Sequence, residues 1–397
     1  QRPVPNLNFV YVDPLGWVYD WSQEGKKAHW DVHLHYYLWQ IWAYFTARSL
    51  LPQLHFDLVH HVSYVKYSNP SFLSLLSIPF VWGPVGGAES APKSFWQDFS
   101  TRAKVYEVLR AVSRWVGEAD PFVRLTAKRS ALTWATTEDT ASRVRQLGAK
   151  NVRVLIESGL RQEEIDRLMQ YPLPETAAIR FISLGRLLHW KGFHLGLRAF
   201  AAAGIPNAEY WVVGDGPERD RLERLAADLG IADRVKFWGR VDRDEGLTKL
   251  GESHVLVHPS LHDSGGWVCL EAMAAGRPIV CLALGGPNVQ VTPETGFKIP
   301  ADHPDQAVQE LAQAMSRLAQ NRDLLKQMGR AGQQLVQTRY RWEAKVRSQV
   351  EQYDPLQPSP ATFEPQPAVP SSNVSNSNVS NSNVSNSNVP NSKTIGL

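Results

Sequence analysis

Short apolar runs rich in β-branched and aromatic residues alternate along this chain with stretches whose apolar residues recur at helical spacing. A short run that is apolar at nearly every position is typical of a parallel strand covered on both faces. In the first half of the chain we predict strands at residues 7–12, 56–65, 78–83, 131–137 and 151–156. The helices predicted in this half cover residues 31–51, 101–116 and 138–147.

The second half shows the same alternation more strictly, after a break at residues 171–178 that contains two prolines. Its predicted strands are residues 179–185, 208–214, 235–239, 254–260, 278–284 and 296–299. Its predicted helices cover residues 191–204, 217–229, 244–251, 267–275 and 304–319. Strict strand–helix alternation with short connections predicts doubly wound parallel sheets with right-handed crossovers. We therefore expect an α/β protein with two Rossmann-like domains.

The length of the chain also favours two domains, because 397 residues exceed one common-sized core. We expect an N-terminal domain at residues 1–175 and a C-terminal domain at residues 176–339. A helix at residues 340–355 is expected to pack back on the N-terminal domain. The remaining residues, 356–397, form a tail that contains the five-residue repeat NSNVS at residues 371–390. Such a repeat cannot bury a core, so this tail is expected to be disordered.

Composition limits the classes of protein to which the chain can belong. The net charge is +3 and 43% of the residues are hydrophobic, which fits a soluble enzyme and provides no basic stripe for nucleic acid. No run reaches about 18 apolar residues, so no membrane span is predicted, and the first residues lack a signal-peptide core. The two cysteines, Cys269 and Cys281, lie in apolar stretches and are interpreted as reduced core thiols. A cytoplasmic location is expected.

Two carboxylates, Asp263 and Glu271, lie eight positions apart in the stretch HDSGGWVCLEAMAAG (262–276). On one continuous helix they would lie about 12 Å apart along the axis, too far for the ~5 Å carboxylate pair of a retaining hydrolase. Gly265 and Gly266 break the helix, so Asp263 is assigned to a loop and Glu271 to the following helix. Backbone N–H groups at such a helix start predict a phosphate site. An alternative stays open, in which Asp263 caps the loop and Glu271 is a solvent-facing helix residue.

Arg186 and Lys191 follow the strand predicted at residues 179–185, at the edge of the sheet where open α/β domains bind ligands. Two cations beside a helix start can bind phosphates. A pair of solvated surface cations is the alternative. Because Asp263 follows another strand of the same domain, we favour the phosphate interpretation.

Two other acidic stretches are interpreted as structural. GDGPER (214–219) resembles a dinucleotide fingerprint, but Arg219 replaces the third glycine, so it predicts a turn with Pro217 at the first helical position. Asp242 and Asp244 could hold a divalent cation on a sugar nucleotide, but the helix that follows favours Asp244 as an N-cap. No metal site is predicted.

The second half of the chain resembles family 4 retaining glycosyltransferases, the group 1 type with the GT-B fold. The matching segments follow the family's order and spacing: SLGRLLHWKGF (183–193), VVGDGPERDRLERLAADLGIADRVKFWGRV (212–241), HPSLHDSGGWVCLEAMAAGRPIVC (258–281) and LGGP (284–287). In the first half, residues 57–65 and 81–92 resemble bacterial members that build surface polysaccharides. The resemblance implies two Rossmann-like domains facing a cleft. The family's first strand and Gly-Gly loop are missing, so the N-terminal domain is expected to be incomplete.

The family's paired acids are two glutamates separated by seven residues, and Asp263 and Glu271 occupy these positions. The resemblance implies that Glu271 binds the ribose hydroxyls of the donor nucleotide. It places Asp263, one methylene shorter than the usual glutamate, at the transferred sugar. Arg186 and Lys191 match the family's cationic pair on the pyrophosphate, which makes a metal ion unnecessary. The remaining donor-binding positions that it implies are Ser264, Gly265, Gly266 and Trp267.

On the acceptor side, Gly86 and Gly87 follow a different strand from the family's loop and are expected to line the cleft. Similar proteins carry a cleft histidine near residues 56–65 that touches the transferred sugar. We select His61 over His60 for this contact. A hydrogen-bonded strand histidine is the open alternative.

The resemblance therefore implies a hexosyltransferase that acts with retention of configuration on a nucleotide-diphosphate sugar and a glycan or lipid-linked acceptor. Its expected place is bacterial surface polysaccharide biosynthesis, and neither a cofactor nor nucleic acid is expected. Residues 101–129 are basic and partly aromatic, which fits either contact with an anionic membrane at its inner face or a solvated helix face. A nucleotide-sugar epimerase of the same fold and an inactive nucleotide- or glycan-binding relative are the alternative functions.

Overall fold

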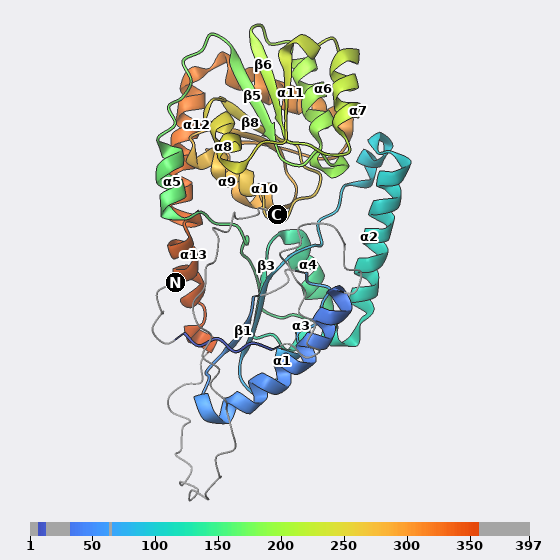
Figure 1. Cartoon of the computed structure of the whole chain (residues 1–397), viewed down its shortest axis with the longest axis vertical. Helices are drawn as coiled ribbons and strands as arrows, with labels where there is room; N and C mark the ends of the chain where they lie inside the picture. Colours follow the sequence, from blue (N-terminus) through green and yellow to red (C-terminus); the bar gives the residue numbers. More distant parts are fainter. Residues whose placement is uncertain (1–6, 13–31, 63–65, 357–397) are drawn as a thin grey trace, which may run out of the picture. The chain divides into compact units, whose positions relative to one another are not determined.

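The computed structural model describes residues 7–12, 32–62 and 66–356, which form two parallel sheets covered by helices (Figure 1). Apart from its first residue, the tail expected at residues 356–397 lies outside the described residues. None of the helices in the described part of the chain is both long and apolar enough to cross a membrane.

The N-terminal sheet has four parallel strands in the order β1-β2-β3-β4. They are β1 (Val59–His61), β2 (Phe80–Val85), β3 (Leu132–Ala135) and β4 (Val152–Val154). The helical segments of this half are α1 (Val32–Leu54), η1 (Phe72–Leu75), η2 (Lys93–Asp98), α2 (Thr101–Ala119), α3 (Pro121–Arg129) and α4 (Glu138–Leu147). The strand predicted at residues 7–12 is wrong. No strand of the described residues pairs with it, and its apolar side chains are largely exposed, Tyr11 by 90%.

Helix α2 is fixed at both ends by short polar side chains. The Ser100 hydroxyl accepts a hydrogen bond from the Ala103 N–H at the start of the helix. Asp120 ends α2, and its carboxylate accepts from the Phe122 N–H, so the same residue caps α3. Satisfying these N–H groups stabilises a helix start by about 1 kcal/mol, and it sets where each helix begins.

The C-terminal sheet has six parallel strands in the order β10-β9-β8-β5-β6-β7. They are β5 (Ile179–Leu184), β6 (Ala208–Val213), β7 (Val235–Gly239), β8 (Val255–His258), β9 (Ile279–Leu282) and β10 (Gly296–Ile299). The helices of this half are α5 (Gln162–Met169), η3 (His189–Lys191), α6 (Phe193–Ala203), α7 (Arg219–Asp228), η4 (Ala232–Arg234), α8 (Arg243–Gly251), α9 (Trp267–Ala274), α10 (Gly285–Gln290) and α11 (Pro304–Gln320).

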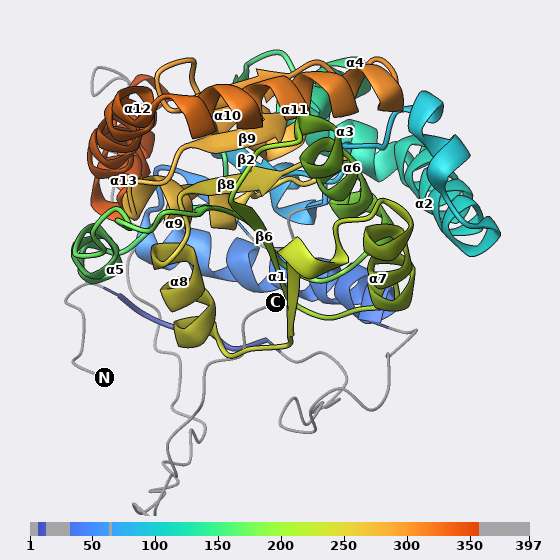
Figure 2. The same cartoon turned by 90° about the horizontal axis from the view of Figure 1, so that it is seen from above.

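Side chains that alternate along the strands of this sheet pack into two separate hydrophobic cores, one on each face. Phe181 and Val212 pack with residues of α6, α7 and α11. Ile182 and Trp211 pack on the other face with residues of α5, α8 and α9. Figure 2 shows α6 and α11 on one side of the sheet and α8 and α9 on the other. Because both faces of the sheet are buried, the sequences of these strands are apolar at nearly every position.

Both cysteines are free and buried, Cys269 on α9 and Cys281 on β9, which confirms their interpretation as core thiols. Burial raises the pKa of Cys281 to about 12. The predicted start of the helix at Pro217 is wrong. Helix α7 begins at Arg219, so Pro217 lies in the preceding turn rather than at the first helical position.

The segment after α12 (Arg322–Leu335) contacts the N-terminal half. It consists of η5 (a π-helix, Val336–Tyr340), α13 (Trp342–Val350) and η6 (Asp354–Leu356). The Leu160 N–H donates to the Tyr340 carbonyl at 2.9 Å, and the Trp342 N–H returns a bond to the Leu160 carbonyl at 3.0 Å. Further along, the Tyr353 hydroxyl lies 2.8 Å from Nδ1 of His60 in β1.

Candidate active site

The strand order of the C-terminal sheet contains one topological switch point. From β5 the chain builds outward through β6 and β7, and then returns to the other side of β5 with β8. Ligands of open α/β sheets bind where strand order reverses, at the carboxyl ends of the two strands. Arg186 and Lys191 follow β5, and Asp263 follows β8. The topology therefore brings these three predicted residues to the same edge.

Lys191 and Asp263 form an ion pair across this switch point. Lys191 Nζ donates to Asp263 Oδ2 at 2.5 Å, and both side chains are largely buried. His258, at the end of β8, also lies against this oxygen, with Nε2 at 3.2 Å. Burial alone would raise the pKa of Asp263, but the hydrogen bond from His258 and the charge of Lys191 hold it well below its usual range.

The glycines of the LGGP segment make close backbone contacts with the loop that carries Asp263. The Gly286 N–H donates to the Asp263 carbonyl at 2.6 Å. Gly285 has φ +52°, and a Cβ atom there would lie only 2.3 Å from the same carbonyl oxygen. Only glycine combines this backbone conformation with so close an approach.

Gly265 and Gly266 connect this loop to α9. Gly266 has φ +51° and is the N-cap of the helix, with no side chain capping it. Its N–H lies 3.3 Å from Asp263 Oδ1, so Asp263 also acts as the loop cap that the alternative interpretation described. The Gly265 carbonyl accepts from Ser158 at 2.6 Å and from Gln290 at 2.7 Å. Trp267 is the first residue of α9 and is 45% exposed.

Glu271 lies on α9 and is 8% exposed, so the alternative of a solvent-facing residue is wrong. Arg243 Nη2 lies 3.0 Å from Glu271 Oε1 and 2.8 Å from Glu164 Oε1. Burial raises the pKa of Glu271, and the hydrogen bond and charge of Arg243 oppose that rise. One arginine therefore compensates two carboxylates next to the predicted donor site.

Arg186 is exposed, and its guanidinium makes no hydrogen bond or ion pair among the described residues. The backbone around it is tightly held. The Leu187 N–H donates to the Asp215 carbonyl at 3.0 Å. A Cβ atom at Gly214 would lie 1.9 Å from the Gly185 carbonyl oxygen. The glycines of GDGPER thus allow two loops to touch, as expected of a turn.

The acidic pair at the start of α8 has a structural role that differs in detail from the prediction. Asp242, rather than Asp244, is the N-cap, and its carboxylate accepts from the Glu245 N–H at 2.8 Å. Asp244 forms an exposed ion pair with Arg167 at 2.7 Å. The cap lies two residues earlier than predicted because α8 already begins at Arg243. The described residues contain no group of three or more His, Cys, Asp or Glu placed to hold a metal ion.

The glycine loop after β2 lies next to the loop that carries Asp263 and Ser264. A Cβ atom at Gly86 would be 2.6 Å from the Thr136 hydroxyl and 3.5 Å from Cβ of Ser264. Gly87 has φ +99° and open space beside it, and its N–H donates to Glu89 Oε2 at 3.0 Å. The structure thus brings Gly86 of the first half together with Ser264 of the second.

The hydrogen bonds that His61 and His60 make with described residues go to partners outside the group around Asp263. His61 is 6% exposed, with Tyr36 Oη 2.8 Å from its Nε2 and Ser71 Oγ 2.5 Å from its Nδ1. His60 Nε2 lies 2.6 Å from the Gly83 carbonyl oxygen. Both rings are therefore engaged in hydrogen bonds, as the alternative interpretation describes.

Sequence reasoning missed Glu157, which follows β4 and lies against Gly265 in the loop that carries Asp263. A Cβ atom at Gly265 would be 3.0 Å from Glu157 Oε1. Its other carboxylate oxygen, Oε2, is buried and has no hydrogen-bond partner among the described residues. Burial raises the pKa of Glu157, and a hydrogen bond with Ser264 opposes the rise. The sequence did contain one indication of this residue, because Glu157 directly follows the strand predicted at residues 151–156.

Comparison with known proteins agrees with this geometry. Residues 165–335 match the family model described as glycosyl transferases group 1. The lipopolysaccharide core biosynthesis glycosyltransferase LpsD of Rhizobium meliloti is 31% identical over 219 residues, which cover 55% of this chain and 62% of LpsD. The chain is similar to group 1 glycosyltransferases. It spans between 44% and 62% of the length of the first curated relatives that it matches.

Solved structures give the fold of the larger part of the chain. Sucrose-phosphate synthase from Thermosynechococcus elongatus aligns with a TM-score of 0.55 at 21% identity, over 81% of this chain and 78% of that one. HepE of Anabaena, solved in complex with UDP, aligns with a TM-score of 0.53 at 20% identity, over 78% and 81%. The predicted fold class is confirmed: this is a GT-B fold with two parallel sheets.

Proposed function

We propose that this protein is a retaining glycosyltransferase that moves a hexose from a nucleoside-diphosphate sugar to a glycan or lipid-linked acceptor. The observation that carries the proposal is the Lys191–Asp263 pair at the switch point between β5 and β8. This is the edge at which an open α/β sheet binds a nucleotide. The similarity to LpsD supports a place in bacterial surface polysaccharide biosynthesis.

The reaction releases a nucleoside diphosphate, whose negative charge must be stabilised as it develops. Arg186 has no competing partner among the described residues, and Lys191 can turn from Asp263 to a phosphate. The start of α9, capped only by Gly266, offers backbone N–H groups to the same anion. Preorganised donors of this kind lower the barrier without a metal ion, and we propose a metal-independent reaction.

Within the donor site, Glu271 would bind the ribose and Asp263 the transferred sugar. Arg243 occupies Oε1 of Glu271, which leaves its second oxygen for the ribose hydroxyls. Ser264 and Gly265 lie on the loop between the two acids, and Trp267 presents an exposed ring at the start of α9.

On the acceptor side we place the loop of Gly86 and Gly87, with His61 kept as a candidate sugar contact. Glu157 joins them, because its unpartnered Oε2 can accept a hydrogen bond from a sugar hydroxyl. A buried acceptor without a partner costs about 1–3 kcal/mol, so a hydroxyl that satisfies it would bind favourably.

The outer face of α2 fits a membrane that presents the acceptor lipid. Val105, Leu109, Val112 and Val116 recur at helical spacing and are exposed, as is Trp115 by 68%. Arg102 and Lys104 are exposed beside this stripe. An apolar stripe with cations at its edges is suited to an anionic interface, and we propose peripheral contact at the inner face of the membrane.

The proposal is tested by a donor screen followed by a transfer assay. UDP-, GDP- and ADP-sugars are first compared by thermal shift, with UDP-sugars as the first probes because HepE was solved with UDP. The donor that stabilises the protein is then incubated with and without acceptor glycans. Transfer with retained anomeric configuration supports the proposal. An epimerised donor without acceptor identifies an epimerase, and binding without either product identifies an inactive relative.

A further inference from the structure

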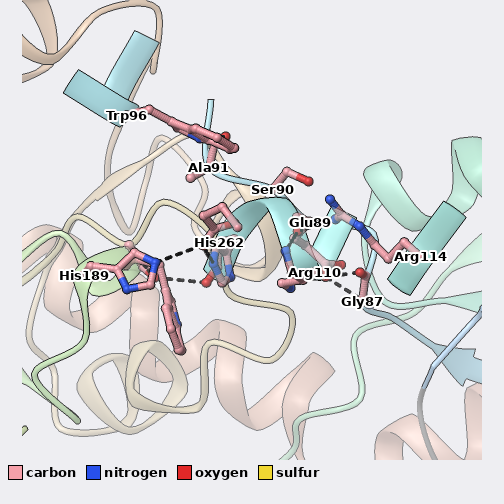
Figure 3. Close-up of polar contacts among 12 residues, drawn as sticks. Gly87, Glu89, Ser90, Ala91, Trp96, Arg110, Arg114, His189 and His262 are labelled. Carbon is pink, nitrogen blue, oxygen red and sulfur yellow. Dashed lines mark hydrogen bonds and ion pairs between the residues drawn. The ribbon is translucent and has the colours of Figure 1, made fainter. Parts of the chain in front are cut away.

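Glu107, on α2, is a fully buried carboxylate that contacts two histidines of the other half of the chain. It is 2% exposed. Its Oε1 lies 3.0 Å from His189 Nε2 and 3.1 Å from His262 Nε2, and Figure 3 shows the two rings with these bonds. Burial would raise the pKa of Glu107, but hydrogen bonds from both histidines lower it to about 2. The group is therefore a carboxylate that accepts two N–H bonds.

The two histidines belong to the two loops that carry the proposed donor site. His189 lies in η3 with Lys191. His262 directly precedes Asp263. Glu107 is thus bound to both sides of the Lys191–Asp263 pair, each time within two residues of it.

Aromatic rings close this contact from solvent. The Trp190 ring stacks between Tyr106 and His262, with centroids at 5.1 and 5.0 Å. Phe99 lies edge-on to His189 at 4.9 Å. Hydrogen bonds to a charged group are strengthened where water is excluded, so the position of α2 and those of the two loops depend on one another.

The same face of α2 also holds the glycine loop of the acceptor side. Arg110 and Arg114 follow Glu107 at positions i+3 and i+7, which lie on one face of a helix. Arg114 Nη1 donates to the Ala88 and Glu89 carbonyls at 2.9 and 3.0 Å. Arg110 donates to the Glu89 and Gly87 carbonyls, and Figure 3 shows both arginines directed at this loop.

We propose that Glu107 is a positioning residue of the transferase. Through His189 and His262 it holds the Lys191 and Asp263 loops at a fixed place relative to the glycine loop, which the same helix face holds through Arg110 and Arg114. Glu107 acts through other residues and touches neither substrate. This role rests on the proposed function, because it explains how the donor and acceptor sides are held at a distance that permits transfer.

The experiment compares Glu107→Ala, Glu107→Gln and a matched control, Glu118→Ala. Glu118 lies on the same helix and accepts from Tyr67 at 2.6 Å, away from both histidines. Amide hydrogen exchange of residues 188–192 and 259–266 is the first readout, and kcat and KM for the donor are the second. Misplacing reacting groups by about 1 Å can cost about 100-fold in rate, so Glu107→Ala should lower kcat by about 100-fold and affect KM much less.

Glu107→Gln keeps the oxygen that accepts both bonds, and its kcat should stay within about tenfold of the wild type, since hydrogen bonds to a charged group are about twice as strong as neutral ones. Exchange of both segments should rise in Glu107→Ala and stay unchanged in Glu118→Ala. Unchanged exchange in Glu107→Ala, or an equal effect of Glu118→Ala, would overturn the proposal. If Glu107→Ala does not fold, the same comparison is made between Glu107→Gln and Glu118→Gln. A wild-type protein that transfers no sugar would refute the proposed function, whereas hydrogen exchange would still decide whether Glu107 fixes these loops.

Discussion

Lys191 Nζ lies 2.5 Å from Asp263 Oδ2, so the loop after β5 and the loop after β8 are joined by one ion pair. His258 adds a third group to the pair at 3.2 Å. A donor diphosphate at this edge would compete with Asp263 for the lysine. The ion pair therefore connects donor binding to the place of the acid that is proposed to face the transferred sugar.

Replacing Lys191 with alanine should lower kcat/KM by about 100- to 1,000-fold, the loss seen when one preorganised charge-stabilising donor is removed. The reason is that the leaving diphosphate loses a fixed cation. Steady-state transfer kinetics measure this loss, and circular dichroism shows whether the fold survives. Lys326→Ala is the control, because Lys326 is exposed on α12. If Lys191→Ala had wild-type kinetics, the assignment of Lys191 to the donor site would be wrong.

Glu271 and Glu164 offer a matched pair, because Arg243 contacts both at 3.0 and 2.8 Å. Glu271→Ala should weaken binding of the nucleoside diphosphate by about 10- to 100-fold, since a hydrogen bond to a charged group contributes about 1.5–3 kcal/mol. Glu164→Ala should have little effect. Calorimetry with the normal and the 2′- and 3′-deoxy nucleotides measures the difference. Equal losses in both variants would mean that the carboxylates act only through Arg243.

Gly285 and Gly204 have nearly the same φ, +52° and +55°, but only Gly285 lies against another backbone. A Cβ atom at Gly285 would be 2.3 Å from the Asp263 carbonyl, whereas nothing lies within 4 Å at Gly204. Alanine at both sites strains the left-handed backbone, so their difference isolates the close approach. Gly285→Ala should lower the free energy of unfolding by about 1–3 kcal/mol more than Gly204→Ala, measured by urea unfolding. If both variants lost the same free energy of unfolding, the Asp263 loop would be able to move away from the new Cβ atom at residue 285.

His254 should make the protein less stable in acid. It is 2% exposed, Nδ1 accepts from the Arg180 N–H at 3.0 Å, and burial lowers its pKa to about 4. The unfolded chain binds this proton near pH 6.5, so the free energy of unfolding should be flat above pH 6.5. It should fall by on the order of 3 kcal/mol as the pH drops to 4.

The measurement is urea unfolding at several pH values between 4 and 7.5 for the wild type, His254→Gln and a control, His303→Gln. His254→Gln should have a smaller pH slope than the wild type. His303, whose side chain is 52% exposed, provides the same substitution at an exposed histidine for comparison. A wild-type slope in His254→Gln would show that other groups carry the acid sensitivity.

The apolar stripe of α2 predicts binding to anionic vesicles. Leu109→Ser with Trp115→Ser should reduce binding by at least about tenfold, because each large apolar side chain contributes about 1.5–3 kcal/mol when fully buried. Sedimentation with vesicles of phosphatidylglycerol and phosphatidylcholine measures it. Val346→Ser, a 49% exposed residue on α13, is the control. Binding that is equal in the double variant, or equal on neutral vesicles, would contradict the role of this face.

The sheet pattern was the most predictable part of the molecule, because strands covered on both faces need apolar residues at nearly every position. Residues 7–12 have the same pattern and form no strand, since apolar spacing does not reveal whether a neighbouring strand exists. The cap of α8 was placed two residues late at Asp244, because both acids fit the capping preference equally well.

The loops at the switch point could be located from the sequence, but the contact that holds them could not. Glu107 lies 82 residues from His189 and 155 residues from His262. On its own helix, Glu107 looks like one of several charges on a solvated surface. Only the packing of α2 against the other half shows that this carboxylate is buried and that the neighbouring charges are not.

Cys269 and Cys281 are the only cysteines of the chain, and both are buried. Burial raises the pKa of both thiols, so neither presents a thiolate to a reagent in neutral solution. A cysteine introduced on an exposed position would therefore be the single reactive thiol of the native protein. Maleimide dyes could then be attached to one chosen helix face without first removing the natural cysteines.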